Sequence, residues 1–330
     1  MGKTARGLGW LNGVTILDLS SLLPSPFAAH LLAGFGARVI KIESPNRPDP
    51  ARQFGYVPPG PNATSTCYRA INSNKELVWL DLKTDEGRSK LYELVRTADA
   101  AIEGYRPDVR RRLGIDYDTL ARHNPAFVLC SVGGYDPDGP YRDRAGHDIN
   151  FVARSGILDQ TRDANGRCVL PGLPIGDYVV AQAAALRLAC AIFGVRASKK
   201  GAHVVVTIEE ALHEVQWPFL SEMVESGEYA RAGDTLVTGK YPCYRLYEAK
   251  GGTFALGALE EKFWKTFCEA IGRPELVKEQ FATGEEGRRV GAEVEKTLAT
   301  RSFDDWWKLF QKTDCCIEPV LAVKEVLRGL

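Results

Sequence analysis

The chain has 330 residues, and its 42 Lys and Arg balance its 42 Asp and Glu, so the formal net charge is zero. This length suffices for one large domain or two unequal domains with a buried core. With 45% apolar and 25% charged residues, the composition is that of a globular protein, which excludes a disordered, collagen-like or coiled-coil chain. The balanced charge lacks the basic excess of a nucleic-acid-binding protein, so we expect no nucleic acid partner.

The eight cysteines include no C-x-x-C pair, and most stand in apolar stretches. This usage is typical of a cytoplasmic protein whose thiols stay reduced and mostly buried, and no metal site is expected. The N-terminal residues are basic without a following apolar stretch, so no signal peptide is predicted. We also identify no run of roughly 18 apolar residues that could cross a bilayer, and expect no membrane association.

Short β-rich runs alternate with helical stretches in the first half of the chain. The sequence predicts strands at 14–20, 37–44, 77–82, 100–105 and 127–135, and helices at 26–35 and 85–97. Thr84 is the expected N-cap of the second of these helices. Such alternation is typical of a doubly wound α/β domain, in which helices cover a parallel sheet.

The second half of the chain changes to a smaller α+β pattern. A strongly helical segment begins at Asp177, residues 204–223 pass from strand to helix, and two short strands at 244–249 and 252–258 form a hairpin. Further helices are predicted at 261–272 and 303–312. We therefore expect a large Rossmann-like domain over 1–205, a connecting helix at 206–224, a small α+β domain over 225–315 and a return segment at 316–330.

Two segments concentrate residues suited to acid–base chemistry. Gly146-His147-Asp148 precedes a predicted helix, and Gly176-Asp177 opens another. Taken alone, the acids suit helix N-termini, and His147 suits an ordinary surface or core position. The functional alternative is that an imidazole and a carboxylate on opposite sides of one carbon remove and return a proton. N–H groups at a helix start would then stabilise the enolate oxygen.

Several separated blocks resemble the family III CoA-transferases, together with α-methylacyl-CoA racemase. They are GVTILDLSSLLPSPFAAHLLAGFGARVIKIESP (13–45), NSNKELVWLDLKTDEGR (72–88) and EGYRPDVRRRLGIDYDTL (103–120). The resemblance covers nearly the whole chain. It implies the interlinked family III CoA-transferase fold, with a Rossmann-like large domain that binds CoA.

Within this family, two further blocks favour the racemase branch. AGHDINFVARSGIL (145–158) is similar to the racemase version, with His147 where the transferases usually carry Tyr or Phe. Residues 257–263 resemble a racemase small-domain motif, with Glu260 as the matching acid, and the multi-glycine loop of the transferases is not found. The resemblance implies epimerisation of 2-methylacyl-CoA thioesters by 1,1-proton transfer through an enolate. No cofactor is required, and coenzyme A is part of the substrate.

Carried over by position, the resemblance makes His147 and Asp177 the two acid/base groups, with Glu260 orienting His147. Asp148 would give its backbone N–H to the thioester oxygen, while its side chain orients the active-site acid. The matching CoA positions are Leu23, Pro24, Asn74, Lys75, Gly104, Tyr105, Arg106 and Arg112. The resemblance also implies an interlinked homodimer in which Glu260 reaches His147 across the subunit interface.

Two alternatives remain open. Asp177 is also where a transferase would place its nucleophilic carboxylate, so CoA transfer between carboxylic acids is the second hypothesis. The third is a catalytically silent CoA-binding protein. Departures from the family pattern motivate it: Ser44 replaces an arginine, Ser25 replaces a turn glycine, and Tyr178 follows Asp177 where racemases tend to have glycines. The family also continues with a C-terminal tail beyond the point where this sequence stops.

Overall fold

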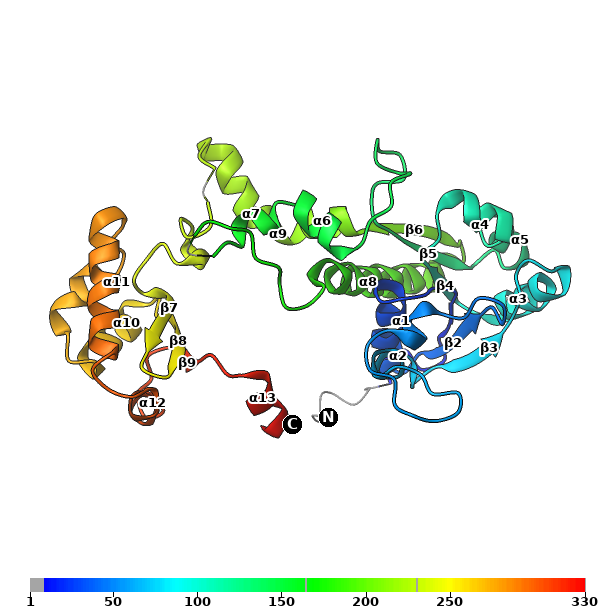
Figure 1. Ribbon diagram of the computed structural model, residues 1–330. Coiled ribbons are helices and arrows are strands. Elements are labelled where there is room, and N and C mark those ends of the chain that lie inside the picture. The colour runs from blue at the N-terminus through cyan, green and yellow to red at the C-terminus, as the bar shows by residue number, and fades with distance from the viewer. Residues whose placement is uncertain (1–8, 164, 230, 330) are drawn as a thin grey trace. The chain divides into compact units, whose positions relative to one another are not determined.

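The computed structural model describes residues 9–163, 165–229 and 231–329. These residues form two compact units, one made of 9–157 and 170–221 and the other of 158–169 and 222–329. The first unit contains a large parallel sheet, and the second contains a small antiparallel sheet (Figure 1). The first eight residues, in which the sequence predicts no signal peptide, lie outside the described residues.

The first unit is built on a six-stranded parallel sheet in the order β3-β2-β1-β4-β5-β6. Its strands are β1 (Thr15–Asp18), β2 (Arg38–Glu43), β3 (Glu76–Trp79), β4 (Ala100–Glu103), β5 (Val128–Gly133) and β6 (Ala202–Thr207). The order reverses between β1 and β4, and ligands of doubly wound sheets bind at the carboxyl ends of the strands at such a switch point. The predicted doubly wound fold is confirmed.

Helices and one short 3-10 helix connect these strands. They are α1 (Pro24–Gly34), η1 (Pro50–Gln53), α2 (Thr66–Asn72), α3 (Asp85–Thr97), α4 (Pro107–Leu113), α5 (Tyr117–His123), α6 (Asp148–Arg154), α8 (Ile175–Ser198) and α9 (Ile208–Ser226). Thr84 caps α3 as predicted, since its hydroxyl oxygen accepts the Gly87 N–H at 3.0 Å. Gly114 ends α4 in the left-handed conformation, which costs glycine little.

The core of the first unit lies where the central strands meet the helices. Ile16 and Leu17 on β1 and Ile102 on β4 are fully buried, as expected for a parallel sheet covered on both faces. Against this apolar background, the complete burial of Asp18 and Glu103 at the carboxyl ends of the same two strands is unusual. Buried acids need partners, and their partners lie at the site described below.

Helix α8 differs from one expectation. Its length and composition would allow it to cross a membrane, although the sequence analysis identified no such run, and this is weak evidence for a span. Val180, Ala184 and Leu188 are fully buried on the side that packs against α1, β5 and β6. The other side exposes Leu186 and Phe193. One side of the helix therefore packs into the core of this unit, and the other side is an uncovered apolar face.

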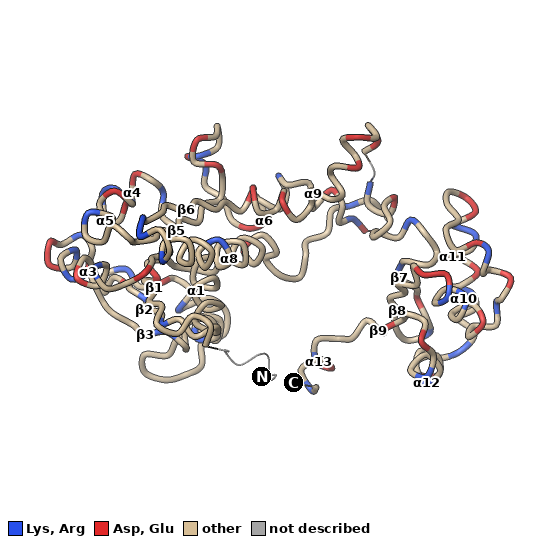
Figure 2. The backbone as a smooth tube through the Cα atoms, turned by 180° about the vertical axis from the view of Figure 1, so that it is seen from behind, with Lys and Arg blue, Asp and Glu red and all other residues tan. Residues whose placement is uncertain are grey.

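The second unit contains the antiparallel sheet β7 (Tyr244–Ala249), β8 (Gly252–Gly257) and β9 (Ile317–Pro319). The predicted hairpin is confirmed, with Gly251 at φ +105° in its turn. The helices of this unit are α7 (Ile157–Gln160), η2 (Leu236–Thr238), α10 (Glu261–Ala270), η3 (Pro274–Glu279), α11 (Gly284–Leu298), α12 (Phe303–Phe310) and α13 (Val323–Gly329). Charges of both signs are distributed along both units (Figure 2).

Candidate active site

A cavity of about 440 Å³ lies at the carboxyl ends of the central strands, at the switch point of the sheet. The titratable groups that line it include His147 and Asp148 from the start of α6 and Asp177 from the first turn of α8, together with Cys67 and Tyr105. Much of the remaining wall is apolar, formed by Leu22, Leu23, Pro24, Phe54, Phe151 and Ile208. The structure thus brings the predicted acid/base pair to one cavity.

The starts of α6 and α8 are joined at this cavity. Asp148 Oδ1 accepts the backbone N–H of Asp177 at 3.1 Å, so the side chain of Asp148 satisfies one of the free donors at the start of α8. Gly176 permits this approach, because a Cβ there would lie 2.9 Å from Asp148 Oδ1 and 3.0 Å from Ile208 Cγ2. The bond and the glycine together fix the beginning of the helix that carries Asp177.

The environment raises the pKa of the Asp177 carboxyl to about 6. Partial burial is the largest cause, and the negative charge of Asp148 adds to it, whereas His147 acts in the opposite direction. A carboxyl group with a pKa in this range is suited to proton transfer near neutral pH. The backbone N–H of Asp148 opens α6 and has no acceptor within its own helix.

A second cavity of about 810 Å³ shares Ser20, Ser21, Leu22, Gly104 and Tyr105 with the first, so the two are neighbours. Cationic side chains line it: Arg47, Lys83, Arg88, Arg106 and Arg112. Guanidinium and ammonium groups in this number suit the phosphates of a nucleotide-bearing ligand. The predicted CoA positions Leu23, Pro24, Gly104, Tyr105, Arg106 and Arg112 all line one of the two cavities.

Two predicted CoA positions are not brought to either cavity. Lys75 is buried, and its ammonium group donates to Asp18 Oδ2, the Pro26 carbonyl and Asn72 Oδ1, each at 2.8 Å. Its three donors are therefore used inside the protein, and none is left for a phosphate. The amide of Asn74 instead pairs with His30 on α1. In this arrangement neither residue lines either of these two cavities, and a contact of either with CoA stays a prediction.

The residues that depart from the family pattern also have clear positions. Ser25 is buried at the first cavity, and Ser44 lines the second. An isolated antiparallel β-bridge pairs Ser44 with Arg47, so an arginine lines the second cavity next to the serine. Tyr178 packs edge-on against Phe27, with ring centroids 5.0 Å apart, and is not among the residues that line the first cavity.

Glu260 belongs to the second unit. It is exposed at the start of α10, and its carboxylate raises the pKa of the nearby Cys316 thiol, after the larger effect of burial. Its contact with His147 stays a prediction. A cavity of about 1220 Å³ in the same unit contains none of the predicted site residues.

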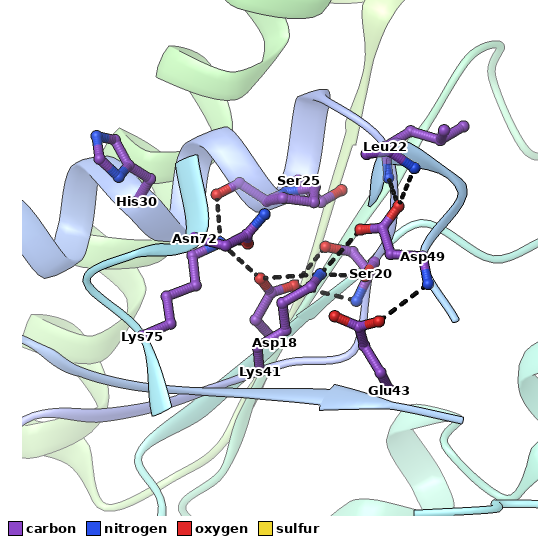
Figure 3. A network of polar contacts seen from close by, with 12 residues as sticks. Asp18, Ser20, Leu22, Ser25, His30, Lys41, Glu43, Asp49, Asn72 and Lys75 are labelled. Atoms are coloured by element: carbon purple, nitrogen blue, oxygen red, sulfur yellow. Dashed lines mark hydrogen bonds and ion pairs between the residues drawn. The ribbon is translucent and has the colours of Figure 1, made fainter. Parts of the chain in front are cut away.

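The sequence analysis missed a cluster of buried charges around Lys41, one of which, Asp49, lines the second cavity (Figure 3). Lys41 Nζ lies 3.2 Å from Asp49 Oδ2 and 3.8 Å from Asp18 Oδ2, and the side chains of all three are at most 1% exposed. Burial alone would raise the pKa of Asp18, but Lys41 and Lys75 lower it to about 2. The signal that could have revealed the cluster was a lysine between two isoleucines in strand β2.

This cluster holds the loop between β1 and α1. Asp18 Oδ1 accepts the Ser20 N–H at 3.1 Å, Lys41 donates to the Ser20 carbonyl at 2.9 Å, and Asp49 Oδ1 accepts the Leu22 N–H at 3.0 Å. Leu22 has φ +69°, a left-handed conformation that costs a residue with a Cβ about 1–2 kcal/mol. The three buried charges offset this cost at a residue that both cavities share.

A doubly wound sheet with a basic cavity beside an acid–base cavity at its switch point is the arrangement of an enzyme acting on a phosphate-bearing substrate. The comparison with known families makes this class specific. Residues 11–329 match the model of CoA-transferase family III, and the chain belongs to this family.

Characterised relatives include enzymes of both reaction types. A succinate–glutarate CoA-transferase from Agrobacterium fabrum is 28% identical over 92% of this chain and 77% of its own length. The human α-methylacyl-CoA racemase is also 28% identical, over 96% of this chain and 79% of its own. A crystal structure of a CaiB/BaiF family protein from Brucella suis matches with a TM-score of 0.83 at 24% identity, over 97% and 86% of the two chains. That structural match supports the fold.

Proposed function

We propose that the protein epimerises 2-methylacyl-CoA thioesters by 1,1-proton transfer through an enolate. The observation that carries this proposal is the presence of His147 and Asp177 on the wall of one cavity, where Asp177 has a pKa raised to about 6. Two such groups on one cavity can exchange roles: one removes the α-proton of a given epimer, and the conjugate acid of the other donates a proton to the opposite face of the α-carbon.

In this proposal the enolate forms between the two bases. When one base removes the α-proton, negative charge moves to the thioester oxygen, and the N–H of Asp148 at the start of α6 stabilises it. The conjugate acid on the opposite side then donates a proton to the α-carbon, which inverts its configuration. The bond from Asp177 N–H to Asp148 keeps the starts of α6 and α8 in register during this exchange.

The second cavity supplies the binding site for the nucleotide end of coenzyme A. Its cationic lining suits the phosphates, and the shared segments allow one ligand to occupy both cavities. The first cavity already holds Asp148 and Asp177, so the charge of a dicarboxylic acyl chain is disfavoured there. We therefore propose a neutral, branched acyl group in contact with the apolar wall.

Removing each base separately tests this proposal. The variants His147→Ala and Asp177→Asn, incubated in deuterated water with each epimer of a 2-methylacyl-CoA, should both lose inversion. Each should still exchange the α-proton of the one epimer that the remaining base faces. Unchanged inversion and α-deuterium incorporation in His147→Ala would show that the assignment is wrong. Binding of acyl-CoA without exchange by the wild-type protein would instead favour a catalytically silent CoA-binding protein.

CoA transfer between carboxylic acids is the second candidate, and the names of several relatives favour it. In that reaction Asp177 would attack the thioester carbonyl and expel CoA as a thiolate, which gives a mixed anhydride; CoA would then re-attack to give an enzyme thioester and a free acid. Trapping an adduct on Asp177 with hydroxylamine during turnover would support it. Failure to exchange isotope between a free acid and its acyl-CoA would exclude it.

A further inference from the structure

The two cavities meet over two short backbone segments, one after β1 and one after β4. The residues common to both cavities are Ser20, Ser21 and Leu22 in the first segment and Gly104 and Tyr105 in the second. A ligand that occupies both cavities must pass over these segments. Their positions therefore determine how its two ends fit at the same time.

A buried carboxylate holds the backbone of each segment. Asp49 Oδ1 accepts the Leu22 N–H at 3.0 Å, and Asp49 is itself paired with Lys41. Glu103 Oε2 accepts the Tyr105 N–H at 2.6 Å, and its other oxygen accepts from Arg110 at 2.8 Å. Both carboxylates are nearly inaccessible to solvent, so water does not compete with the backbone N–H groups for their oxygens.

The two carboxylates do more than satisfy buried donors. Leu22 stays at φ +69° although it carries a side chain, and its amide is fixed by the charge of Asp49. Without that acceptor, Leu22 would relax to a more favourable conformation, and the segment would move at the junction of the cavities. Such a displacement weakens the binding of a ligand that spans both cavities, because its two ends are no longer aligned with them. It affects a ligand that occupies only one cavity much less.

We propose that Asp49 and Glu103 are positioning residues that hold the two shared segments, so that the nucleotide end and the acyl end of one ligand bind in register. This inference rests on the proposed function only in taking an acyl-CoA as the ligand. It assigns a ligand-positioning role to two buried acids that take no part in the proposed proton transfer, one of which, Asp49, also lines the second cavity.

Binding of a whole and a truncated ligand tests the proposal. Isobutyryl-CoA can span both cavities, whereas S-isobutyryl-pantetheine lacks the nucleotide, and calorimetry gives the ratio of their affinities. Asp49→Asn removes the charge that holds the Leu22 and Ala51 N–H groups, and Lys41 then competes with them for the single amide oxygen, so the hold on Leu22 weakens. We expect the ratio to fall about tenfold in this variant and in Glu103→Gln.

The control is Leu91→Ala, at a fully buried position of α3 away from the cavities. It should lower the thermal stability of the protein and leave the affinity ratio unchanged. If Asp49→Asn or Glu103→Gln lowers stability but keeps the wild-type ratio, the acids are merely structural and the proposal is wrong. A wild-type protein that binds both ligands equally would also overturn it.

A second measurement isolates the backbone at position 22. Leu22→Gly and Leu22→Ala lose nearly the same side chain, but only glycine adopts a positive φ without cost. Asp49→Asn should therefore lower the affinity ratio less in the Leu22→Gly background than in the Leu22→Ala background. Equal effects would contradict the role of Asp49 in holding Leu22. Failure of the proposed function is distinguishable, because it appears as absent α-deuterium exchange in the wild-type protein.

Discussion

Asp177 retains its proton in the folded protein up to about pH 6, whereas the unperturbed carboxyl loses it near pH 3.8. Between these values the native state binds more protons than the unfolded state, so the contribution of Asp177 to stability falls as the pH rises. Asp177→Asn should therefore increase the free energy of unfolding at about pH 8 by about 1–2 kcal/mol, after allowance for partial exposure.

Denaturant unfolding at about pH 8 and about pH 5 provides the measurement, since the gain should be smaller at the lower pH. A variant that is less stable than the wild type at the higher pH would show that the raised pKa is not a property of the folded protein. Because Asp177 is also a proposed base, Asp177→Asn should be more stable than the wild type at the higher pH but inactive. This combination is expected for a residue that serves catalysis at a cost in stability.

Residue types in context predicted part of this site. The family resemblance implied roles for His147, Asp148 and Asp177, whereas their positions near predicted helix starts also suited ordinary helix caps, and the structure places all three at one cavity. Lys75 was matched to a CoA position by the same resemblance, but the buried acid Asp18, which neutralises it, could not be recognised from the sequence. The pairing of charges buried behind a loop depends on strand order, and strand order is a property of the whole sheet.

At the scale of elements, the junction of α6 and α8 requires a glycine at position 176. Gly176→Ala would place a Cβ within 3.0 Å of Ile208 Cγ2 and closer still to Asp148 Oδ1. We expect the starts of the two helices to separate, which lowers the rate of α-proton exchange by about two orders of magnitude. Stability should fall by about 1–3 kcal/mol.

Gly194 offers a matched control on the same helix, because no atom lies within 4 Å of the position that its Cβ would occupy. Gly194→Ala should keep the wild-type exchange rate and stabilise the protein by about 0.5–1 kcal/mol. Equal exchange rates in the two variants would contradict the role of the α6–α8 junction.

Hydrophobic periodicity and turn residues in the sequence predict most of the elements, including the capped helix α3 and the hairpin β7–β8. Helix α11 is one of the elements that were not predicted, and its three glycines lower its helix propensity. Tertiary contacts explain two of them: a Cβ at Gly287 would lie 2.6 Å from the Ala282 carbonyl oxygen, and one at Gly291 would lie 2.5 Å from Arg245 Nη1. Because these contacts come from residues outside the helix, the sequence of the helix itself does not reveal why glycine is favoured there.

For the whole molecule, the uncovered face of α8 bears on the predicted interlinked homodimer. Leu186 is 66% exposed and Phe193 is 80% exposed, and Trp217 on α9 is 59% exposed. Apolar side chains of this size are typical of surfaces that a second subunit covers. We predict that Phe193→Glu shifts the protein from dimer to monomer in analytical ultracentrifugation and abolishes turnover.

The control for this prediction is Leu77→Glu, which introduces the same charge at an exposed position of the edge strand β3. It should leave both the sedimentation coefficient and turnover unchanged. A wild-type protein that sediments as a monomer while turning over would contradict the predicted dimer and, with it, the predicted contact of Glu260 with His147 between subunits.

The central claim is that two bases exchange one α-proton within a single cavity, and one measurement tests it most directly. A single epimer of a 2-methylacyl-CoA is incubated with the wild-type protein in deuterated water, and nuclear magnetic resonance records α-deuterium and configuration together. The proposed function predicts formation of the other epimer with deuterium at its α-carbon. Retained configuration and an undeuterated α-carbon, with isotope passing between the acyl-CoA and an added free acid, would contradict it.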